Sequence, residues 1–135
     1  MQVSEIMHKG IRSVNINESV KKVAELMRQE DIGALPVLEN DKPIGFVTDR
    51  DIVISCVAEG YDTNGSIRHA MNEDVYTVQE DADFKVATQQ MKDKQVSRIL
   101  VVDSSQKPIG MISLQDLSGN ISQSESANTL NEIKH

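Results

Sequence analysis

Two hydroxyl–aspartate pairs are the residues of this chain whose types and spacing could hold a small molecule. Thr48 stands three positions before Asp51, and Ser113 stands three positions before Asp116. A hydroxyl can donate a hydrogen bond to a phosphate oxygen, and an aspartate can accept two hydrogen bonds from the vicinal hydroxyls of a ribose. Each pair follows a short apolar run, which predicts a strand that ends at the hydroxyl and a helix that begins beside the aspartate. The N-terminus of such a helix presents unsatisfied N–H groups and partial positive charge, which suits a phosphate.

The same spacing also has a purely structural interpretation. A hydroxyl residue followed three positions later by a carboxylate is the pattern of a capping box, here with Asp in place of the usual Glu or Gln. Either pair alone favours capping, whereas two copies inside the repeat described next favour ligand binding at one of them. Gly45 and Gly110, ahead of the pairs, leave room for a ring or a backbone to approach closely.

The pairs lie in an internal repeat. Position numbers differ by 64 up to the turn at Ser104-Ser105, where one extra residue raises the offset to 65. Identical residues then recur in both halves at Met7, Val14, Lys21, Met27, Val37, Lys42 to Gly45 and Asp51, matched by Met71, Val78, Lys85, Met91, Val101, Lys107 to Gly110 and Asp116. Each repeat is one supersecondary unit that needs a neighbour to cover its apolar face. The recurrent methionines are expected to pack in the core.

Each repeat is predicted to form a helical turn, a short strand, a helix, a β-hairpin and a second helix. The first helix spans about 18–30 with Asn17 as N-cap, and its counterpart is capped by Asp81. Their expected buried residues are Val20, Val23, Ala24 and Met27 in repeat one and Phe84, Ala87, Thr88 and Met91 in repeat two.

The hairpins are predicted to pair 35–38 with 44–47 and 99–102 with 109–112. Pro36 suggests a strand start or an edge strand. The second helix of repeat one spans about 49–58, and the matching helix begins at Leu117. The helix at 49–58 is expected to bury Ile52, Val53, Cys56 and Val57. The predicted division is repeat one at 1–60, a linker at 61–65, repeat two at 66–120 and a polar tail at 121–135.

Composition excludes several classes of protein. A net charge of −7 and a pI near 4.9 argue against nucleic-acid binding. No stretch approaches the roughly 18 apolar residues of a membrane span, and there is no signal core, so a soluble cytoplasmic protein is expected. Cys56 alone cannot form an internal disulfide. The three histidines, His8, His69 and His135, are too scattered for a metal site. No catalytic arrangement is recognisable, so we do not expect an enzyme.

The strand sequences Leu35-Pro36-Val37 and Leu100-Val101-Val102-Asp103, with the two Gly-apolar-apolar-[Thr/Ser]-x-x-Asp junctions, resemble a tandem pair of cystathionine β-synthase (CBS) domains. The resemblance covers about Val3 to Leu117. It implies an α/β fold of two β-α-β-β-α repeats related by pseudo-two-fold symmetry, with small sheets packed against helices. It also implies a regulatory module that binds adenosine-containing ligands in clefts between the repeats and that associates into dimeric discs.

The resemblance further implies which residues bind the ligand. In the family, stretches matching 13–14 and 32–36 here, or 77–78 and 96–100, sandwich the adenine. Arg50 and Arg98 are the natural phosphate partners, with Lys42 and Lys107 as weaker candidates. Repeat two has Ser-Leu-Gln-Asp where repeat one has Thr-Asp-Arg-Asp, so it loses the local arginine, for which Arg98 could compensate. The implied ligand-binding residues are Ser13, Ile32, Ala34, Pro36, Thr48, Arg50, Asp51, Thr77, Val96, Arg98, Leu100, Ser113 and Asp116.

These observations favour a homodimeric sensor of AMP, ADP or ATP that needs no cofactor and signals to a separate effector protein by conformational linkage. One alternative is a dimerisation or scaffold module whose binding sites are vestigial. Another changes only the ligand, to S-adenosylmethionine or NAD, which share the ribose. One occupied and one degenerate site is also compatible with the sequence.

Overall fold

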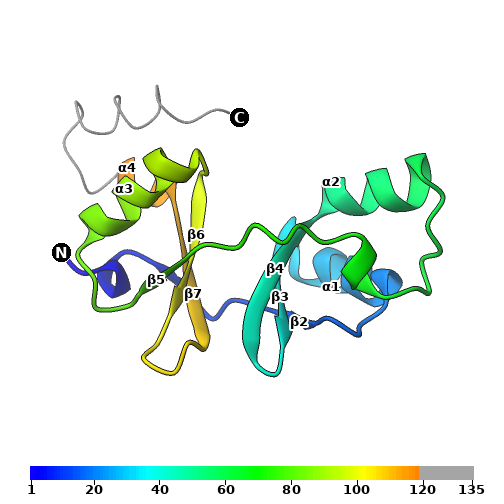
Figure 1. Cartoon of the computed structure of the whole chain (residues 1–135), viewed down its shortest axis with the longest axis horizontal. Helices are drawn as coiled ribbons and strands as arrows, with labels where there is room; N and C mark the ends of the chain where they lie inside the picture. The colour runs from blue at the N-terminus through cyan, green and yellow to red at the C-terminus, as the bar shows by residue number, and fades with distance from the viewer. Residues whose placement is uncertain (119–135) are drawn as a thin grey trace. The chain divides into compact units, whose positions relative to one another are not determined.

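The computed structural model describes residues 1–118, and they form two compact units (Figure 1). One unit comprises Arg12–Val75, and the other combines Met1–Ile11 with the chain from Tyr76 onward. The units therefore do not coincide with the two repeats along the sequence. Each unit holds the helices and hairpin of one repeat together with the opening segment of the other. The predicted tail at 121–135 lies outside the described residues.

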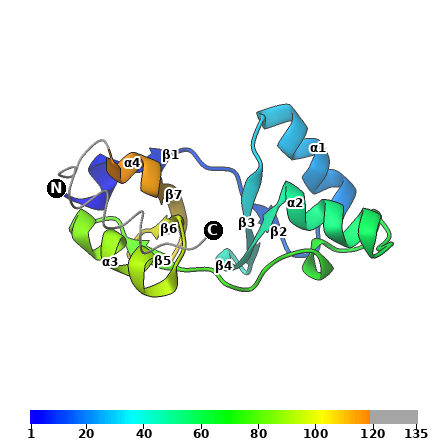
Figure 2. The same cartoon turned by 90° about the horizontal axis from the view of Figure 1, so that it is seen from above.

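The Arg12–Val75 unit is a three-stranded sheet with helices on one face (Figures 1 and 2). Its strand order is β2-β3-β4, with β2 parallel and β4 antiparallel to β3. Its elements are β2 (Val14–Asn15), α1 (Val20–Glu30), β3 (Ala34–Glu39), β4 (Lys42–Thr48), α2 (Asp49–Ile52), the π-helical turn η2 (Val53–Ala58) and the 3-10 turn η3 (Ile67–His69). The β3–β4 hairpin confirms the prediction, and Asn40 and Asp41 turn it with φ values of 52° and 64°.

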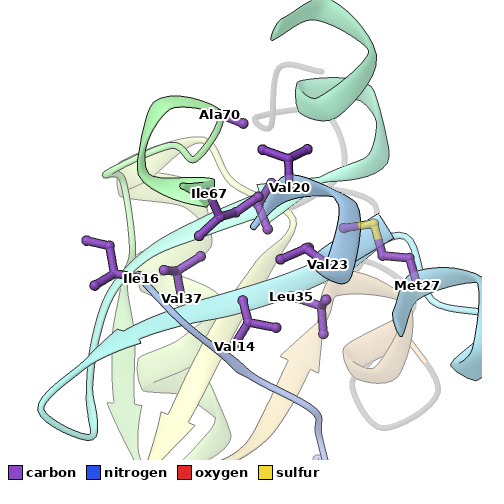
Figure 3. Packing of buried hydrophobic residues seen from close by; sticks show 10 residues of the cluster. Val14, Ile16, Val20, Val23, Met27, Leu35, Val37, Ile67 and Ala70 are labelled. Atoms are coloured by element: carbon purple, nitrogen blue, oxygen red, sulfur yellow. The ribbon is translucent and has the colours of Figure 1, made fainter. Parts of the chain in front are cut away.

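The core of this unit joins one helix face to the sheet (Figure 3). Val20, Val23 and Met27 of α1 are buried against β3, and the spacing of these three confirms the predicted apolar face. Ile67 of η3, from the opening segment of repeat two, is fully buried in the same cluster. The remaining buried members are Val14, Ile16, Leu35, Val37, Val47 and Ala70.

The second unit repeats this plan with one more strand. Its sheet has the order β1-β7-β6-β5, in which β1 and β6 run antiparallel to β7 and β5 runs parallel to β6. Its elements are η1 (Val3–Glu5), β1 (His8–Lys9), β5 (Thr77–Gln79), α3 (Phe84–Lys94), β6 (Arg98–Val102), β7 (Pro108–Ser113) and α4 (Leu114–Ser118). The buried core consists of Val3, Val78, Ala87, Met91, Ile99, Val101, Ile112, Leu114 and Leu117.

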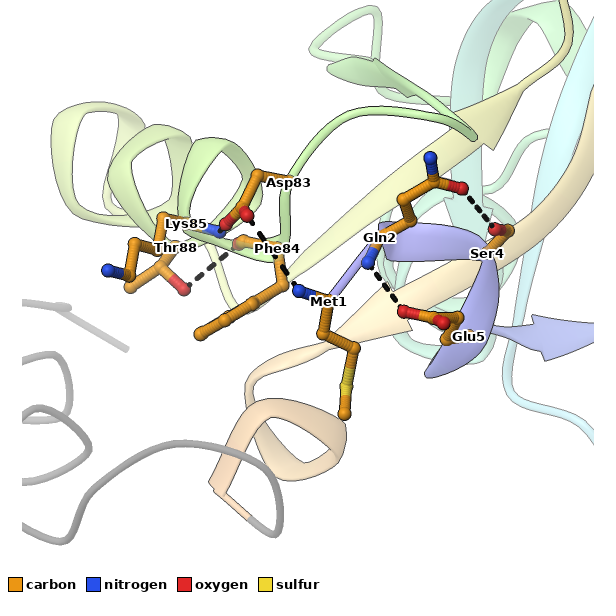
Figure 4. Close-up of polar contacts among 8 residues, drawn as sticks. All are labelled: Met1, Gln2, Ser4, Glu5, Asp83, Phe84, Lys85 and Thr88. Atoms are coloured by element: carbon orange, nitrogen blue, oxygen red, sulfur yellow. Dashed lines mark hydrogen bonds and ion pairs between the residues drawn. The ribbon is translucent and has the colours of Figure 1, made fainter.

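The N-terminal segment is bound into this second unit along its backbone. The N–H of Val3 donates to the carbonyl of Ala82 at 2.8 Å, and the N–H of Phe84 donates to the carbonyl of Met1 at 2.9 Å. The Met1 amino group lies 3.8 Å from the carboxylate of Asp83, which also caps α3 (Figure 4). Val3 is fully buried beside residues of repeat two. The opening segment is therefore part of the fold of the second half.

Both predicted N-caps of the long helices are wrong by two positions. Ser19, not Asn17, caps α1 by accepting the N–H of Lys22 at 3.1 Å. The N–H of Asn17 is bound by the Asn15 side chain, which holds residues ahead of the helix in a turn. Asp83, not Asp81, caps α3. Several polar residues precede each helix, and the choice among them depends on where the turn ends.

Three expectations about buried positions are also wrong. Ala24 is exposed because it lies beyond the edge of the α1 stripe, and Leu26 packs against the core instead. In the second helix, Val53 and Val57 are 55% and 78% exposed. Ile52 and Cys56 do pack on the core, with Ser55 buried between them, so the inward face is narrower than predicted.

Pro36 and the start of the last helix differ from the predictions as well. Pro36 lies inside β3, the middle strand, opposite Phe46. Proline has no backbone N–H to donate, and neither neighbouring strand needs one at this position. The Phe46 backbone forms its hydrogen bonds with Asn72 and not with Pro36, and the pairing with β2 begins only at Val37. Helix α4 begins at Leu114, directly after the strand, and not at Leu117.

Candidate functional site

The first junction is a complete capping box. The N–H of Thr48 donates to Asp51 Oδ2 at 2.9 Å, and the N–H of Asp51 donates to Thr48 Oγ1 at 3.1 Å. Strand β4 ends at Thr48 and α2 begins at Asp49, as the apolar pattern predicted. The structural interpretation of this pair is therefore correct, and any binding role is additional to it.

The amide groups at the start of α2 are already bonded. The N–H of Asp49 donates to the carbonyl of Gly33 at 3.0 Å, and that of Arg50 donates to Asp49 Oδ1 at 2.8 Å. With the bond from Asp51 to Thr48, the first three helical N–H groups all have acceptors. The expectation that this helix start offers unsatisfied N–H groups to a phosphate is wrong.

The second junction caps its helix in the same way and adds two contacts. Asp116 Oδ2 accepts the backbone N–H of Ser113 at 2.8 Å and the Ser113 hydroxyl at 2.9 Å. The N–H of Asp116 donates to Ser113 Oγ at 3.2 Å. His8 Nε2 lies 2.7 Å from the other carboxylate oxygen, Oδ1. Both oxygens of this aspartate are thus engaged by the chain itself.

His8 is a neighbour of the site that sequence reasoning missed, because His8 precedes Asp116 by more than a hundred positions. The pairing of β1 with β7 brings it there, with His8 opposite Met111. The internal repeat gave part of the information needed to place His8, because the equivalent position in the other repeat pairs in the same way. His8 corresponds to Asn72, and Asn72 pairs with Phe46, the counterpart of Met111.

The two repeated glycines are explained by this same strand pairing. A Cβ added at Gly45 would stand 2.5 Å from the carbonyl oxygen of Asn72, and one added at Gly110 would stand 2.7 Å from that of His8. Of the two groups that the sequence allowed, a ring or a backbone, a backbone occupies the space. Glycine at these two positions therefore allows the opening segment of the other repeat to pack closely against the strand.

Capping leaves acceptor capacity at the first junction. A carboxylate has about four lone-pair positions. In the described part of the chain, Asp51 forms no ion pair, and one hydrogen bond, from Thr48, reaches its carboxylate. Its side chain is half-buried, so Oδ1 could accept from a hydroxyl group of a ligand while Oδ2 keeps the cap.

The cations differ in their availability. Arg12 and Arg68 form surface ion pairs with Glu30 and Glu39, at 2.9 and 3.3 Å. Among the described residues, the exposed Arg50 and Arg98 form none.

Arg98 lies directly across from Ser113 in the β6–β7 pairing, so their side chains share one face of the sheet. Lys42 stands at the opposite end of β4 from Thr48, about 20 Å away at 3.3 Å per residue. Lys107 likewise precedes the first residue of β7. The geometry therefore favours the two arginines over the two lysines as partners of an anion at the junctions.

The other implied site residues have unequal exposure. Ala34 pairs with Thr48, as Arg98 does with Ser113, and Thr77 pairs with Leu100. The side chains of Pro36 and Leu100 are buried, so only their backbones could contact a ligand. Half-buried positions are Ser13, Ile32, Ala34, Thr77 and Val96, of which Ile32 and Val96 pack against the cores.

Other features of the described residues do not add a site. A groove of about 260 Å³ runs along α1, lined by Glu18, Lys22 and neighbouring side chains, and of the stretches implied to sandwich the adenine it includes only Val14. Within residues 1–118, no three His, Cys, Asp or Glu side chains are grouped so as to hold a metal ion. None of the helices in that range is both long and apolar enough to cross a membrane.

Comparison with known proteins identifies the repeat. The model of the CBS domain matches residues 3–57 and 66–123. The chain is 34% identical over 119 residues to protein MK0525 of Methanopyrus kandleri, covering 87% of this chain but only 61% of that protein. It is 31% identical to the CBS domain-containing protein YhcV of Bacillus subtilis, covering 98% of this chain and 95% of YhcV. Hypoxic response protein 1 of Mycobacterium tuberculosis is 34% identical over 115 residues, or 84% of this chain and 80% of that protein.

Solved structures show the same architecture. The crystal structure of hypoxic response protein I, with two coordinated zinc ions, superposes with a TM-score of 0.77 at 30% identity, covering 90% of this chain and 99% of that one. The CBS domain pair of MJ0100, in complex with 5′-methylthioadenosine and S-adenosyl-L-methionine, gives a TM-score of 0.73 over 88% of this chain and 94% of that one. At 24% identity, this second likeness shows the fold alone.

Proposed function

This chain belongs to the CBS domain family, and on that premise we propose that it is a regulatory module that binds adenosine nucleotides, AMP, ADP or ATP, at its strand-to-helix junctions. Asp51 and Asp116 would accept the ribose hydroxyls, Thr48 and Ser113 would face the phosphate side, and an arginine at each junction would hold the phosphate. The ligand would favour one arrangement of the chain, or of a homodimer, and a separate effector protein would respond to it.

The observation that carries this proposal is the arginine at each junction. Arg50 adjoins Asp51 on the chain, and Arg98 lies across the sheet from Ser113. Both side chains are exposed and neither forms an ion pair among the described residues, in a protein with a net charge of −7. An unpaired guanidinium beside a half-buried carboxylate suits a ligand that carries both a phosphate and a vicinal diol.

A second candidate function is a dimerisation or scaffold module whose junctions bind nothing. The capping boxes favour it, because both aspartates fold back onto main-chain amides and so already have a structural role. A third candidate keeps the sensor but replaces the nucleotide by S-adenosylmethionine or NAD. These share the ribose, so the aspartates alone do not separate them.

Thermal shifts with AMP, ADP, ATP, S-adenosylmethionine and NAD test the three together. A ligand at 100 times its Kd adds about 2.7 kcal/mol to the folded state. Asp51→Asn and Asp116→Asn keep an oxygen for the cap but lose the charge, so each should reduce the shift, and the double variant should abolish it. Asp83→Ala is the matched control, because it removes the N-cap of α3 without touching a junction.

The result separates the candidates. A lower Tm with an undiminished ligand shift is expected for Asp83→Ala. If none of the five compounds stabilises the wild type, the sensor is wrong and the scaffold function is favoured. If the double variant retains the full shift, the ligand binds away from the junctions and the proposed sites are wrong. A shift with S-adenosylmethionine or NAD and with no adenylate would favour the third candidate.

A further inference from the structure

The contact between His8 and Asp116 makes the two junctions unequal. Both residues lie in the same compact unit, and 2.7 Å separates His8 Nε2 from Asp116 Oδ1. At the first junction, Asn72 takes the position of His8, opposite Phe46. The Asn72 side chain instead accepts the N–H of Asp74 at 2.7 Å. Of the two junction aspartates, Asp116 is the one in contact with a basic side chain within the described residues.

The exposed fractions of the two side chains would allow His8 to compete with a ligand for Asp116. Asp116 is 14% exposed and is held by its cap, whereas the His8 side chain is 74% exposed. The imidazole can therefore rotate into solvent while the carboxylate stays in place. Asp116 Oδ2 already accepts two hydrogen bonds and Oδ1 is in contact with His8, so the roughly four lone-pair positions of the carboxylate cannot also accept both hydroxyls of a ribose unless His8 is displaced.

We propose that His8 holds the carboxylate of Asp116 in the ligand-free protein and competes with the ribose for it, so that the second junction binds adenosine nucleotides more weakly than the first. This inference rests on the proposed function and adds to it a residue that sets the difference between the sites. Because His8 belongs to repeat one and Asp116 to repeat two, the opening segment of one repeat regulates the binding residue of the other.

Asp116 is the charged group in direct contact with His8, with 2.7 Å between His8 Nε2 and Asp116 Oδ1. The strand paired with β1, β7, carries no titratable side chain. The charged groups on the surrounding elements are Asp116 on α4, Lys9 on β1, Arg98 on β6 and Glu5 on η1. Glu5 accepts the N–H of Gln2 at 2.7 Å. A carboxylate in direct contact should dominate over the others.

The first test needs no ligand. In a double-mutant cycle on the full chain at pH 6, His8→Asn and Asp116→Asn should change the Tm non-additively, because each removes the same pair. Additive changes would overturn the proposal at this step.

The second test titrates AMP and ATP by calorimetry into full-length variants with one junction disabled. In the Asp51→Asn background, where the second junction remains, adding His8→Asn should tighten binding by up to about fivefold, the range for exposed ion pairs. In the Asp116→Asn background, His8→Asn should change nothing. In the same Asp116→Asn background, Asn72→His should weaken nucleotide binding at the first junction. Asn72→Ala is the control for loss of the hydrogen bond between the Asn72 side chain and the N–H of Asp74.

The outcomes keep the two proposals distinct. Binding at the second junction that depends on Asp116 but is unaffected by His8→Asn overturns this inference and leaves the proposed function standing. If neither the wild type nor His8→Asn binds AMP or ATP, both fail together.

Discussion

Replacing Val3 by Ala should destabilise the half of the protein that lies farthest from it in sequence. Val3 is fully buried among residues of repeat two, and its N–H bonds the carbonyl of Ala82. The change removes two carbons at about 0.8 kcal/mol each, or about 1.6 kcal/mol, and the cavity that remains raises the loss to about 2–3 kcal/mol. Ile67 is its counterpart in the other repeat and is fully buried in the other unit. Ile67→Ala should therefore lose about 2–5 kcal/mol.

Hydrogen–deuterium exchange read by mass spectrometry locates the loss. Val3→Ala should speed exchange in β6 and β7, and Ile67→Ala should speed it in β3 and β4, so each substitution acts across the repeats. Val53→Ala is the matched control, because this valine is 55% exposed and its truncation should change stability by less than about 0.5 kcal/mol. If Val3→Ala instead loosens β3 and β4 while leaving β6 and β7 protected, the assignment of the opening segment to the second unit is wrong.

Two further predictions concern single positions. Gly110→Ala should cost about 2–3 kcal/mol in chemical denaturation, because its Cβ would meet the backbone carbonyl oxygen of His8 at 2.7 Å, and a backbone atom cannot swing away. Gly60 has a φ of 76° and open space around it, so Gly60→Ala should cost only about 1 kcal/mol. A loss for Gly60→Ala that equals or exceeds the loss for Gly110→Ala would contradict the steric explanation. Val57→Ser should change monomer stability by less than about 0.5 kcal/mol, because this side chain is 78% exposed. A loss in the same assay above about 1.5 kcal/mol would show that Val57 is covered, as the sequence had suggested.

Local patterns predicted the elements well and their partners poorly. The hairpins follow from β-branched runs on either side of turn residues, and the register Leu35 with Val47 agrees with that pairing. The junction at Thr48 and Asp51 is likewise local, because a capping box closes within four residues. The N-caps at Ser19 and Asp83 were missed since several neighbouring residues have equal capping ability.

Long-range placement could not be predicted in this way. Whether Val3 packs on its own repeat or on the other depends on contacts across some eighty positions, and both repeats offer the same apolar face. The same limit applies to the candidate site. The Thr/Ser and Asp pairs were found from spacing alone, but the contact of His8 with Asp116 arises only because β1 joins β7.

The exchange of opening segments has a consequence for how the chain can be divided. If it were cut between the repeats, 1–60 would lose Ile67 and Asn72, which fill its core and pair with β4, and the remainder would lose Val3 and β1. A unit of about 60 residues buries only about 60% of its unfolded surface and is marginal even when intact. Gly45 and Gly110 would then expose strand edges shaped for a segment that is no longer there. The repeats must therefore fold as a pair, and the contact of Asp116 with His8 forms only when both are present.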